Sequence, residues 1–447
     1  MNQRFTAASQ QLYHGIFRDF PALEKAFDTD LLLKEMEGRS TYFIERADNW
    51  TVEIGKVYVK FDKYVRIVYH FCPKEETEEE RSWWGVGQVI HARRFHSLEW
   101  RMENPDIMLF DGHMTLTPDF MDMHLTDNLL IIFPEMLEQY IRRHVREFPP
   151  EYKRPNLQLR AEVRKYVPSK RMLVHITSAD AGVPPLYVKY YHNQHGQFSA
   201  QVQTELSGKL REASTLVEVP RVYFYDREHN FLWQEDWGGS SLKEARPALT
   251  DRESWEVVFR AINVLHQLEP PGMVKNRMGP DHYLNDLVRD VQYILNFLPE
   301  QKDLLEQVEE KIIAVLKNVE APMMLLHGSL FPAQVLRRNG NIAFIDFDSV
   351  SLGDPWYDVS EFLSGLLYEE WIAGTDWQDL QPFRRFAVER YSALSGVPAS
   401  PEVVQAYFTM FFLNKIQQHL KMLKPVPENF LSDIQQICRE LLEENSL

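Results

Sequence analysis

The sequence has 447 residues, enough for two or three domains of about 150 residues each. Hydrophobic residues make up 44% and charged residues 26% of it, a composition that supports folded cores. A formal net charge of −16 argues against a general nucleic-acid surface and disfavours adsorption to anionic lipid. The two cysteines, Cys72 and Cys438, show neither disulfide nor zinc spacing, and no apolar run approaches the ~20 residues of a membrane helix. We therefore expect a cytoplasmic protein without nucleic-acid or membrane partners.

The first 150 residues predict an α+β domain. Apolar side chains recur at helical spacing in residues 1–40, strand-like runs follow at 50–59 and 64–71, and residues 119–147 look helical. The break at Phe148-Pro149-Pro150 marks the expected end of this domain. The strand–turn–strand pattern of residues 57–68 recurs at 163–174. The N-terminal domain 1–150 is therefore either a cap that contains a degenerate copy of the next β-rich region, or a cap that resembles it by chance.

A β-rich region and a helical region follow. Residues 155–245 contain strand-like runs separated by short turns and one helix-prone stretch at 198–215. From residue 246 to 447 the pattern is almost entirely helical, apart from a strand hairpin at 334–346. We expect an α+β fold with a small β lobe and a large helical lobe.

The hairpin gathers oxygen ligands at one end. Asn339-Gly340 is a strong two-residue turn signal, which places Gln334 at the start of one strand and Asp346 at the end of the other. In an extended segment Asp346 and Asp348 point to the same side. Two carboxylates and an amide oxygen suit Mg²⁺ beside phosphates. Solvated acidic residues at the end of a hairpin explain the same pattern equally well.

Residues 326–358 resemble the catalytic loop and metal segment of the aminoglycoside phosphotransferase and choline kinase-like superfamily, relatives of the protein kinases. The family pattern is His-Gly-Asp, four residues, Asn, then Ile-Asp-Phe and Gly-Asp-Pro. His327 and Gly328 match it, Ser329 stands at the position of the catalytic Asp, and Gln334 stands at the Asn position, as in the maltokinase-like branch. Asp346 falls on the metal-binding Asp. The trailing motif falls on Gly353, Asp354, Pro355 and Asp358.

The resemblance implies a bilobal protein-kinase-like fold behind an N-terminal cap, with ATP and Mg²⁺ as cofactors. Lys189 matches the strand lysine that holds the α- and β-phosphates, with Glu205 as its candidate partner and Glu212 as the alternative. The hinge that would hold adenine falls on Gln234, Glu235 and Asp236. The glycine-rich loop is missing, and Lys170 or Arg171 in its place could contact phosphate.

Ser329 leaves the activity open. A serine hydroxyl has no useful basicity near pH 7, so it cannot replace the Asp, although general-base help is typically worth only ~10²–10⁴-fold. One hypothesis is a phosphotransferase that acts on a hydroxyl of a small metabolite, with Asp348 or a substrate group as the base and His327 as a further catalytic residue. The alternative is a nucleotide-binding pseudokinase that regulates or scaffolds a protein partner. A structural platform without nucleotide is the third possibility.

The acceptor cannot be identified from the sequence. Five acidic residues of the helical region could make its pocket acidic, which would suit a cationic acceptor, but placement on the surface is equally compatible with the pattern. They are Asp286, Asp290, Glu361, Glu369 and Glu370.

Overall fold

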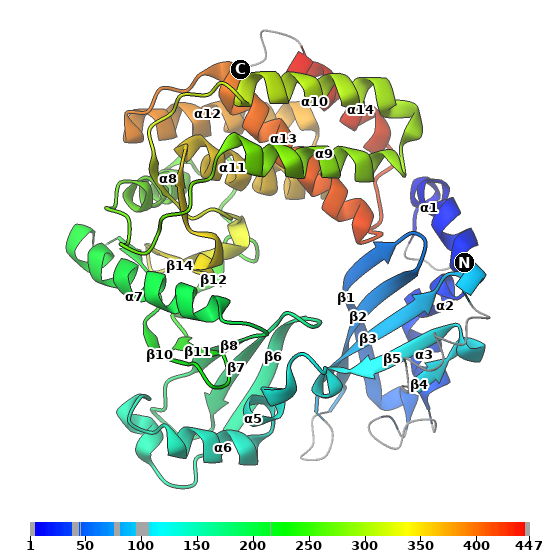
Figure 1. Cartoon of the computed structure of the whole chain (residues 1–447), viewed down its shortest axis with the longest axis vertical. Helices are drawn as coiled ribbons and strands as arrows, with labels where there is room; N and C mark the ends of the chain where they lie inside the picture. The colour runs from blue at the N-terminus through cyan, green and yellow to red at the C-terminus, as the bar shows by residue number, and fades with distance from the viewer. Residues whose placement is uncertain are drawn as a thin grey trace. The chain divides into compact units, whose positions relative to one another are not determined.

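The computed structural model describes residues 5–37, 44, 46–75, 81–94, 107–214 and 216–442, and these form two compact units. Unit 1 comprises Met1–Gly196, Tyr223–Gln234 and Lys421–Pro425. Unit 2 comprises Gln197–Val222, Glu235–Leu420 and Val426–Leu447. Figure 1 labels the elements of both units. None of the helices in the described residues is long and apolar enough to cross a membrane.

The N-terminal part of unit 1 combines short helices with an antiparallel sheet. Its helices are α1 (Ala7–Asp19), α2 (Leu23–Phe27) and α3 (Thr29–Met36). Its strands are β1 (Trp50–Lys60), β2 (Tyr64–Pro73), β3 (Trp83–Ile90), β4 (Ile107–Leu109) and β5 (Met114–Pro118), in the order β1-β2-β3-β5-β4. Val57, Val65 and Ile67 are buried because strand alternation turns them to one face. The predicted strands of this region are confirmed.

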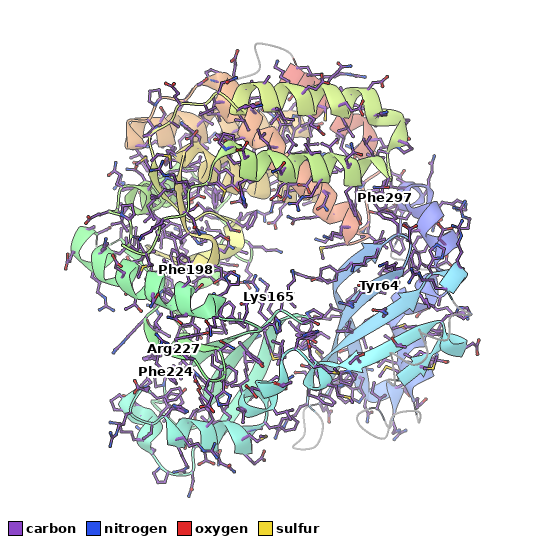
Figure 2. All side chains as sticks on the ribbon, in the orientation of Figure 1. Tyr64, Lys165, Phe198, Phe224, Arg227 and Phe297 are labelled. Atoms are coloured by element: carbon purple, nitrogen blue, oxygen red, sulfur yellow. The ribbon has the colours of Figure 1, made fainter. Side chains whose placement is uncertain are left out.

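A second antiparallel sheet completes unit 1. Its strands are β6 (Leu159–Val167), β7 (Arg171–Ser178), β8 (Leu186–Tyr191), β10 (Val222–Asp226) and β11 (Phe231–Glu235), in the order β10-β11-β8-β7-β6. The helices α5 (Leu129–Ile132) and α6 (Pro134–Arg143) pack on it. Within the predicted helical stretch 119–147 the α-helix is confined to these two segments, and two 3-10 helices, Asp119–Met121 and Thr126–Asn128, precede them. Phe224, labelled in Figure 2, stacks on Trp233 with ring centroids 6.2 Å apart. Trp84 Nε1 donates a hydrogen bond of 2.8 Å to the carbonyl of Val163, which ties the two sheets together.

The two sheets share one strand order. Numbered along the chain, each sheet reads first, second, third, fifth, fourth. The first strand of each leading hairpin carries a register shift, between Ile54 and Val57 in one sheet and between Val163 and Lys165 in the other. This common order supports the interpretation that the N-terminal sheet is a degenerate copy of the second one, which stays a prediction.

Unit 2 is mainly helical, as predicted. Its helices are α7 (His195–Ala213), α8 (Arg252–His266), α9 (Pro280–Leu295), α10 (Lys302–Leu316), α11 (Pro355–Ile372), α12 (Trp377–Ser395), α13 (Pro401–Lys421) and α14 (Phe430–Leu442). Unit 2 includes α7 from Gln197 onward and α13 as far as Leu420. The helices α9 to α14 gather into one bundle (Figure 1). Most of α11 is buried, from Pro355 to Tyr368 without interruption, because apolar residues surround it on all sides.

Short strands beside this bundle carry the segments that resemble a catalytic loop and a metal site. The predicted hairpin is confirmed as β14 (Val335–Arg338) and β15 (Asn341–Phe344), which join β12 (Ser240–Ser241) and β9 (Val217–Glu218) in one sheet. A further pair, β13 (Met324–Leu326) and β16 (Ser351–Gly353), was not predicted. Three residues are too few for a period-two pattern to stand out in a sequence.

Candidate active site

The predicted catalytic loop lies in unit 2 after β13, and the carboxylate of Asp358 holds its first residues. Asp358, in the first turn of α11, accepts hydrogen bonds from the backbone N–H groups of His327 at 2.6 Å and Gly328 at 3.0 Å. The ring of His266 contributes a third contact, with Nε2 3.1 Å from Asp358 Oδ2, and its Nδ1 lies 2.6 Å from Tyr391 Oη. Asp358 and the side chain of His266 are fully buried. Because a buried carboxylate needs such partners, this network fixes the start of the loop.

The backbone at Gly328 brings the loop against the segment that follows the hairpin. Gly328 has φ +76°, and a Cβ at this position would lie 2.0 Å from the carbonyl oxygen of Ser349. Only glycine fits so close an approach in the left-handed region. His327 is buried and its Nε2 lies 3.0 Å from the carbonyl of Ile345, so His327 is a structural member of the loop. Ser329, the next residue after Gly328, is half-buried.

Gln334 and Asp346 lie at the same end of the hairpin. The register pairs Val335 with Phe344, and the N–H of Ile345 donates to the carbonyl of Gln334 at 3.1 Å. The side-chain oxygen of Gln334 accepts the N–H of Phe331 at 2.7 Å, which leaves that oxygen one further lone pair. Asp346 has φ +71°, a conformation that non-glycine residues adopt at a cost of ~1–2 kcal/mol. Such strain is typical of residues whose side-chain direction is functional.

This donor set fits a hard divalent cation. Asp346 supplies a carboxylate and Gln334 an amide oxygen, which are ligands that Mg²⁺ accepts together with phosphate and water. Within the described ranges, no three His, Cys, Asp or Glu side chains gather into a metal-binding group. A cation held here would take its remaining ligands from the nucleotide and from water, as Mg²⁺ usually does.

Asp348 contacts helix α7. The hydroxyl of Ser199 donates a hydrogen bond to Asp348 Oδ1. Buried polar side chains recur along this face of α7 at intervals of four residues, at Ser199, Gln203 and Ser207. The contact was missed because Ser199 lies 149 residues before Asp348. A buried polar stripe on α7 was the only available signal.

Glu205 lies on a different face of α7 from this stripe. Two residues beyond Gln203, it is rotated by about 200° around the helix. Its carboxylate lies 3.0 Å from Lys209 Nζ, one turn further on. Unit 2 therefore gives Glu205 a local partner, and its pairing with Lys189 stays a prediction. The alternative, Glu212, is exposed near the end of the same helix.

The predicted phosphate-binding residues of unit 1 lie in the leading strands of the second sheet. Lys189 is half-buried on β8 and pairs with Leu173 of β7. Lys170 is exposed in the β6–β7 turn, and Arg171 begins β7. Asp122 Oδ2 accepts the N–H of Ser169 in this turn and the hydroxyl of Tyr166, both at 2.7 Å. A carboxylate from the segment before β6 thus holds the turn between β6 and β7.

The predicted hinge side chains have local hydrogen bonds. Gln234 is buried on β11. Glu235 Oε2 accepts the N–H of Arg221 at 3.0 Å, and Asp236 Oδ1 accepts the N–H of Gly238 at 2.8 Å. The side chains of Glu235 and Asp236 therefore shape the backbone, which leaves backbone groups as the candidates for adenine.

Most acidic residues proposed for an acceptor pocket already have partners. Glu370 pairs with Arg246 at 2.5 Å, and Glu369 lies 3.6 Å from the same guanidinium. Asp290 accepts a hydrogen bond from Asn414, and Asp286 pairs with Arg289. Glu361 is buried under the catalytic loop instead. The expectation of an acidic pocket for a cationic acceptor therefore finds no support in these contacts.

A family model described as "Phosphotransferase enzyme family" matches residues 148–394, more than half of the 447 residues. The chain belongs to this phosphotransferase family. The resemblance predicted from the catalytic loop is thereby confirmed, and with it a kinase-like α+β fold. Membership of this family indicates small-molecule phosphoryl transfer as the general function of the fold.

Solved structures of similar proteins include enzymes of this kind, whereas no curated protein matches the chain. A thermostable mutant of aminoglycoside phosphotransferase APH(4)-Ia is 16% identical and has a TM-score of 0.44, over 63% of this chain and 93% of that one. Plasmodium vivax ethanolamine kinase is 12% identical, with a TM-score of 0.45 over 71% and 93%. The macrolide 2′-phosphotransferase MphH from Brachybacterium faecium is 15% identical, with a TM-score of 0.43 over 70% and 99%.

Proposed function

We propose that this protein is an ATP- and Mg²⁺-dependent phosphotransferase that transfers a phosphoryl group to a hydroxyl of a small metabolite. The observation that carries the proposal is the network around Asp358, which holds two consecutive backbone amides of the catalytic loop and one buried histidine ring. A structural platform without chemistry has no need to fix the loop beside the Asp346 metal segment in this way.

The residues divide the work between phosphate and metal. Lys189 would neutralise the α- and β-phosphates, and Lys170 and Arg171, at the β6–β7 turn of the same sheet, are further candidates for phosphate contact. Asp346 and Gln334 would hold Mg²⁺, which neutralises charge and aligns the phosphate oxygens when bound. Gln234, Glu235 and Asp236 would present backbone groups to the adenine.

Asp348 is our candidate for the proton acceptor that Ser329 cannot be. Its carboxylate is half-buried, and the hydroxyl of Ser199 holds one of its oxygens. A carboxylate held in this way can accept the proton of an attacking hydroxyl. Because phosphoryl transfer depends mainly on positioning and charge neutralisation, a displaced base is compatible with a slow reaction.

A second candidate function rests on Ser329 itself. Without a carboxylate at this position, a protein that binds nucleotide without transferring phosphate would be a pseudokinase that regulates or scaffolds a protein partner. Both candidates require the nucleotide site, and they differ only in turnover.

The first experiment measures nucleotide binding. ATP with Mg²⁺ should raise the melting temperature of the wild type, and Asp346→Asn should remove most of that rise. Asp62→Asn is the matched control, because Asp62 is an exposed turn residue of the N-terminal sheet. No rise at millimolar ATP would reject both candidates.

The second experiment measures turnover. Slow ATP consumption by the wild type, increased by Ser329→Asp and reduced by Asp348→Asn, supports the phosphotransferase. Intact ATP binding with no turnover in either the wild type or Ser329→Asp would leave the pseudokinase.

A further inference from the structure

Two carboxylates of α11 hold the catalytic loop on either side of Ser329. Asp358 accepts the amides of His327 and Gly328, while Glu361 Oε2 accepts the amide of Leu330 at 2.7 Å. Asp358 and Glu361 are three residues apart and therefore project from the same face of the helix. Ser329 is thus the one residue of this stretch whose two chain neighbours are both fixed by carboxylates.

A lysine lies beside the second carboxylate. Lys415 of α13 has its Nζ 3.5 Å from the centre of the Phe331 ring, so its ammonium stacks on the loop residue that follows Leu330. A Cβ built at Gly365 of α11 would lie 3.5 Å from Lys415 Cε and 3.6 Å from Phe331 Cδ1. These are ordinary van der Waals distances, which show that Lys415 and Phe331 both pack against α11 at Gly365.

We propose that Glu361 is a positioning residue of the phosphotransfer site, whose carboxylate fixes the loop at Leu330 and, together with Asp358, holds the backbone on both sides of Ser329. The inference rests on the proposed function and names a group that orients the loop around Ser329. Glu361 acts through the backbone of Leu330 rather than through contact with the reacting atoms. Lys415 supports it by offsetting part of its charge.

The charge state of Glu361 follows from its surroundings. The residue is 6% exposed, and burial raises its pKa to about 8, with the negative charge of Asp358 acting in the same direction. The positive charge of Lys415 and the hydrogen bond from Leu330 lower the pKa against that trend. Tyr357, the other titratable group facing Glu361, has its pKa raised by burial and keeps its proton. The hydrogen bond to Leu330 is therefore charge-assisted above about pH 8 and weaker below it.

Ionisation of Glu361 strengthens this hydrogen bond but lowers the free energy of unfolding. Because the pKa of Glu361 in the folded protein exceeds the ordinary value of 4.5, ionisation opposes folding progressively as pH rises from 4.5 to about 8. A glutamine at this position keeps an acceptor for the Leu330 amide and removes the charge. Glu361→Gln should thus be more stable than the wild type at pH 9 and equally stable near pH 5.

The test compares Glu361→Gln with the wild type in ATP turnover from pH 6 to 9.5. The wild-type kcat should rise with an apparent pKa near 8, and Glu361→Gln should lose this rise and about tenfold in kcat at pH 9, with the KM for ATP unchanged. Lys415→Met should move the rise to higher pH. Glu309→Gln is the matched control, since burial also raises the pKa of Glu309, on α10, and it should behave as the wild type.

Two results would overturn the inference. One is a Glu361→Gln enzyme with the kcat and pH profile of the wild type. The other is equal hydrogen exchange of the peptide 327–331 in the wild type and Glu361→Gln at pH 9, whereas faster exchange in the variant supports a positioning role. This second measurement decides if neither the wild type nor Ser329→Asp turns over ATP, in which case the phosphotransferase proposal fails by itself.

Discussion

The two sheets of unit 1 have the same strand order, but they carry different residues at matching positions. In the second sheet, Leu173 pairs with Lys189. The two leading hairpins both have a three-residue turn, and counting from it matches Leu173 with Arg66, which pairs with Gln88. Arg66 Nη2 donates to Gln88 Oε1 at 3.3 Å. The shared strand order therefore does not extend to the proposed phosphate site, because the position that matches Lys189 carries the uncharged Gln88.

The prediction with the largest expected effect tests the difference between Lys189 and its counterpart Gln88 in the other sheet. Lys189→Met should weaken ATP binding by about 100-fold, because charge-assisted hydrogen bonds contribute ~1.5–3 kcal/mol each. Gln88→Met is the matched substitution in the other sheet and should leave ATP binding unchanged. Titration calorimetry on both variants measures the two affinities, and equal losses would show that the sheets do not differ in this way.

The second prediction concerns the two hairpin turns. Asp122→Ala removes the acceptor of both Ser169 N–H and Tyr166 O–H and should lower the free energy of unfolding by about 2–3 kcal/mol. Asp62→Ala, in the turn of the N-terminal sheet, should change it by less than about 0.5 kcal/mol. Urea unfolding measures both free energies. An unchanged value for Asp122→Ala would show that these two hydrogen bonds do not stabilise the β6–β7 turn.

The third prediction concerns Asp119, a buried residue that precedes Asp122 in the sequence. Burial raises the pKa of Asp119 from 3.8 to about 7, so its ionisation opposes folding as pH rises through that window. Asp119→Asn keeps the acceptor for Phe120 N–H and should gain about 1–3 kcal/mol over the wild type at pH 8, with no gain at pH 4. A gain in the free energy of unfolding that does not depend on pH would show that the buried charge of Asp119 is not its cause.

The smallest expected effect is at Ser169, which has φ +61°. Ser169→Gly should raise the free energy of unfolding by about 0.5–1 kcal/mol, because glycine adopts this conformation without strain. Positions 61–63 of the matching turn have no positive φ, so Asp62→Gly should lower it slightly. Melting curves of the two variants should therefore shift in opposite directions.

Much of the fold could be predicted from the sequence because its signals are local. The Asn339-Gly340 turn, the strands around residues 54, 68 and 163, and the helical region beyond residue 250 follow from periodicity and turn chemistry. The stretch that resembles a catalytic loop was recognised through His327, Gly328 and the trailing Gly353-Asp354-Pro355 motif, and its catalytic role stays a prediction. Short strands such as β13 and β16 escaped because three residues carry too little pattern.

The sequence by itself predicted the family, which the family model confirms, and it showed Ser329 within the stretch that resembles a catalytic loop. Only the tertiary structure decided which side chains hold that loop. Asp358 and Glu361 reach it across 30 to 31 residues, and Ser199 reaches Asp348 across 149. Periodicity reports the secondary structure of each segment, whereas such contacts depend on how distant segments pack. For that reason the serine was visible in the sequence, but the two carboxylates that hold its neighbours were not.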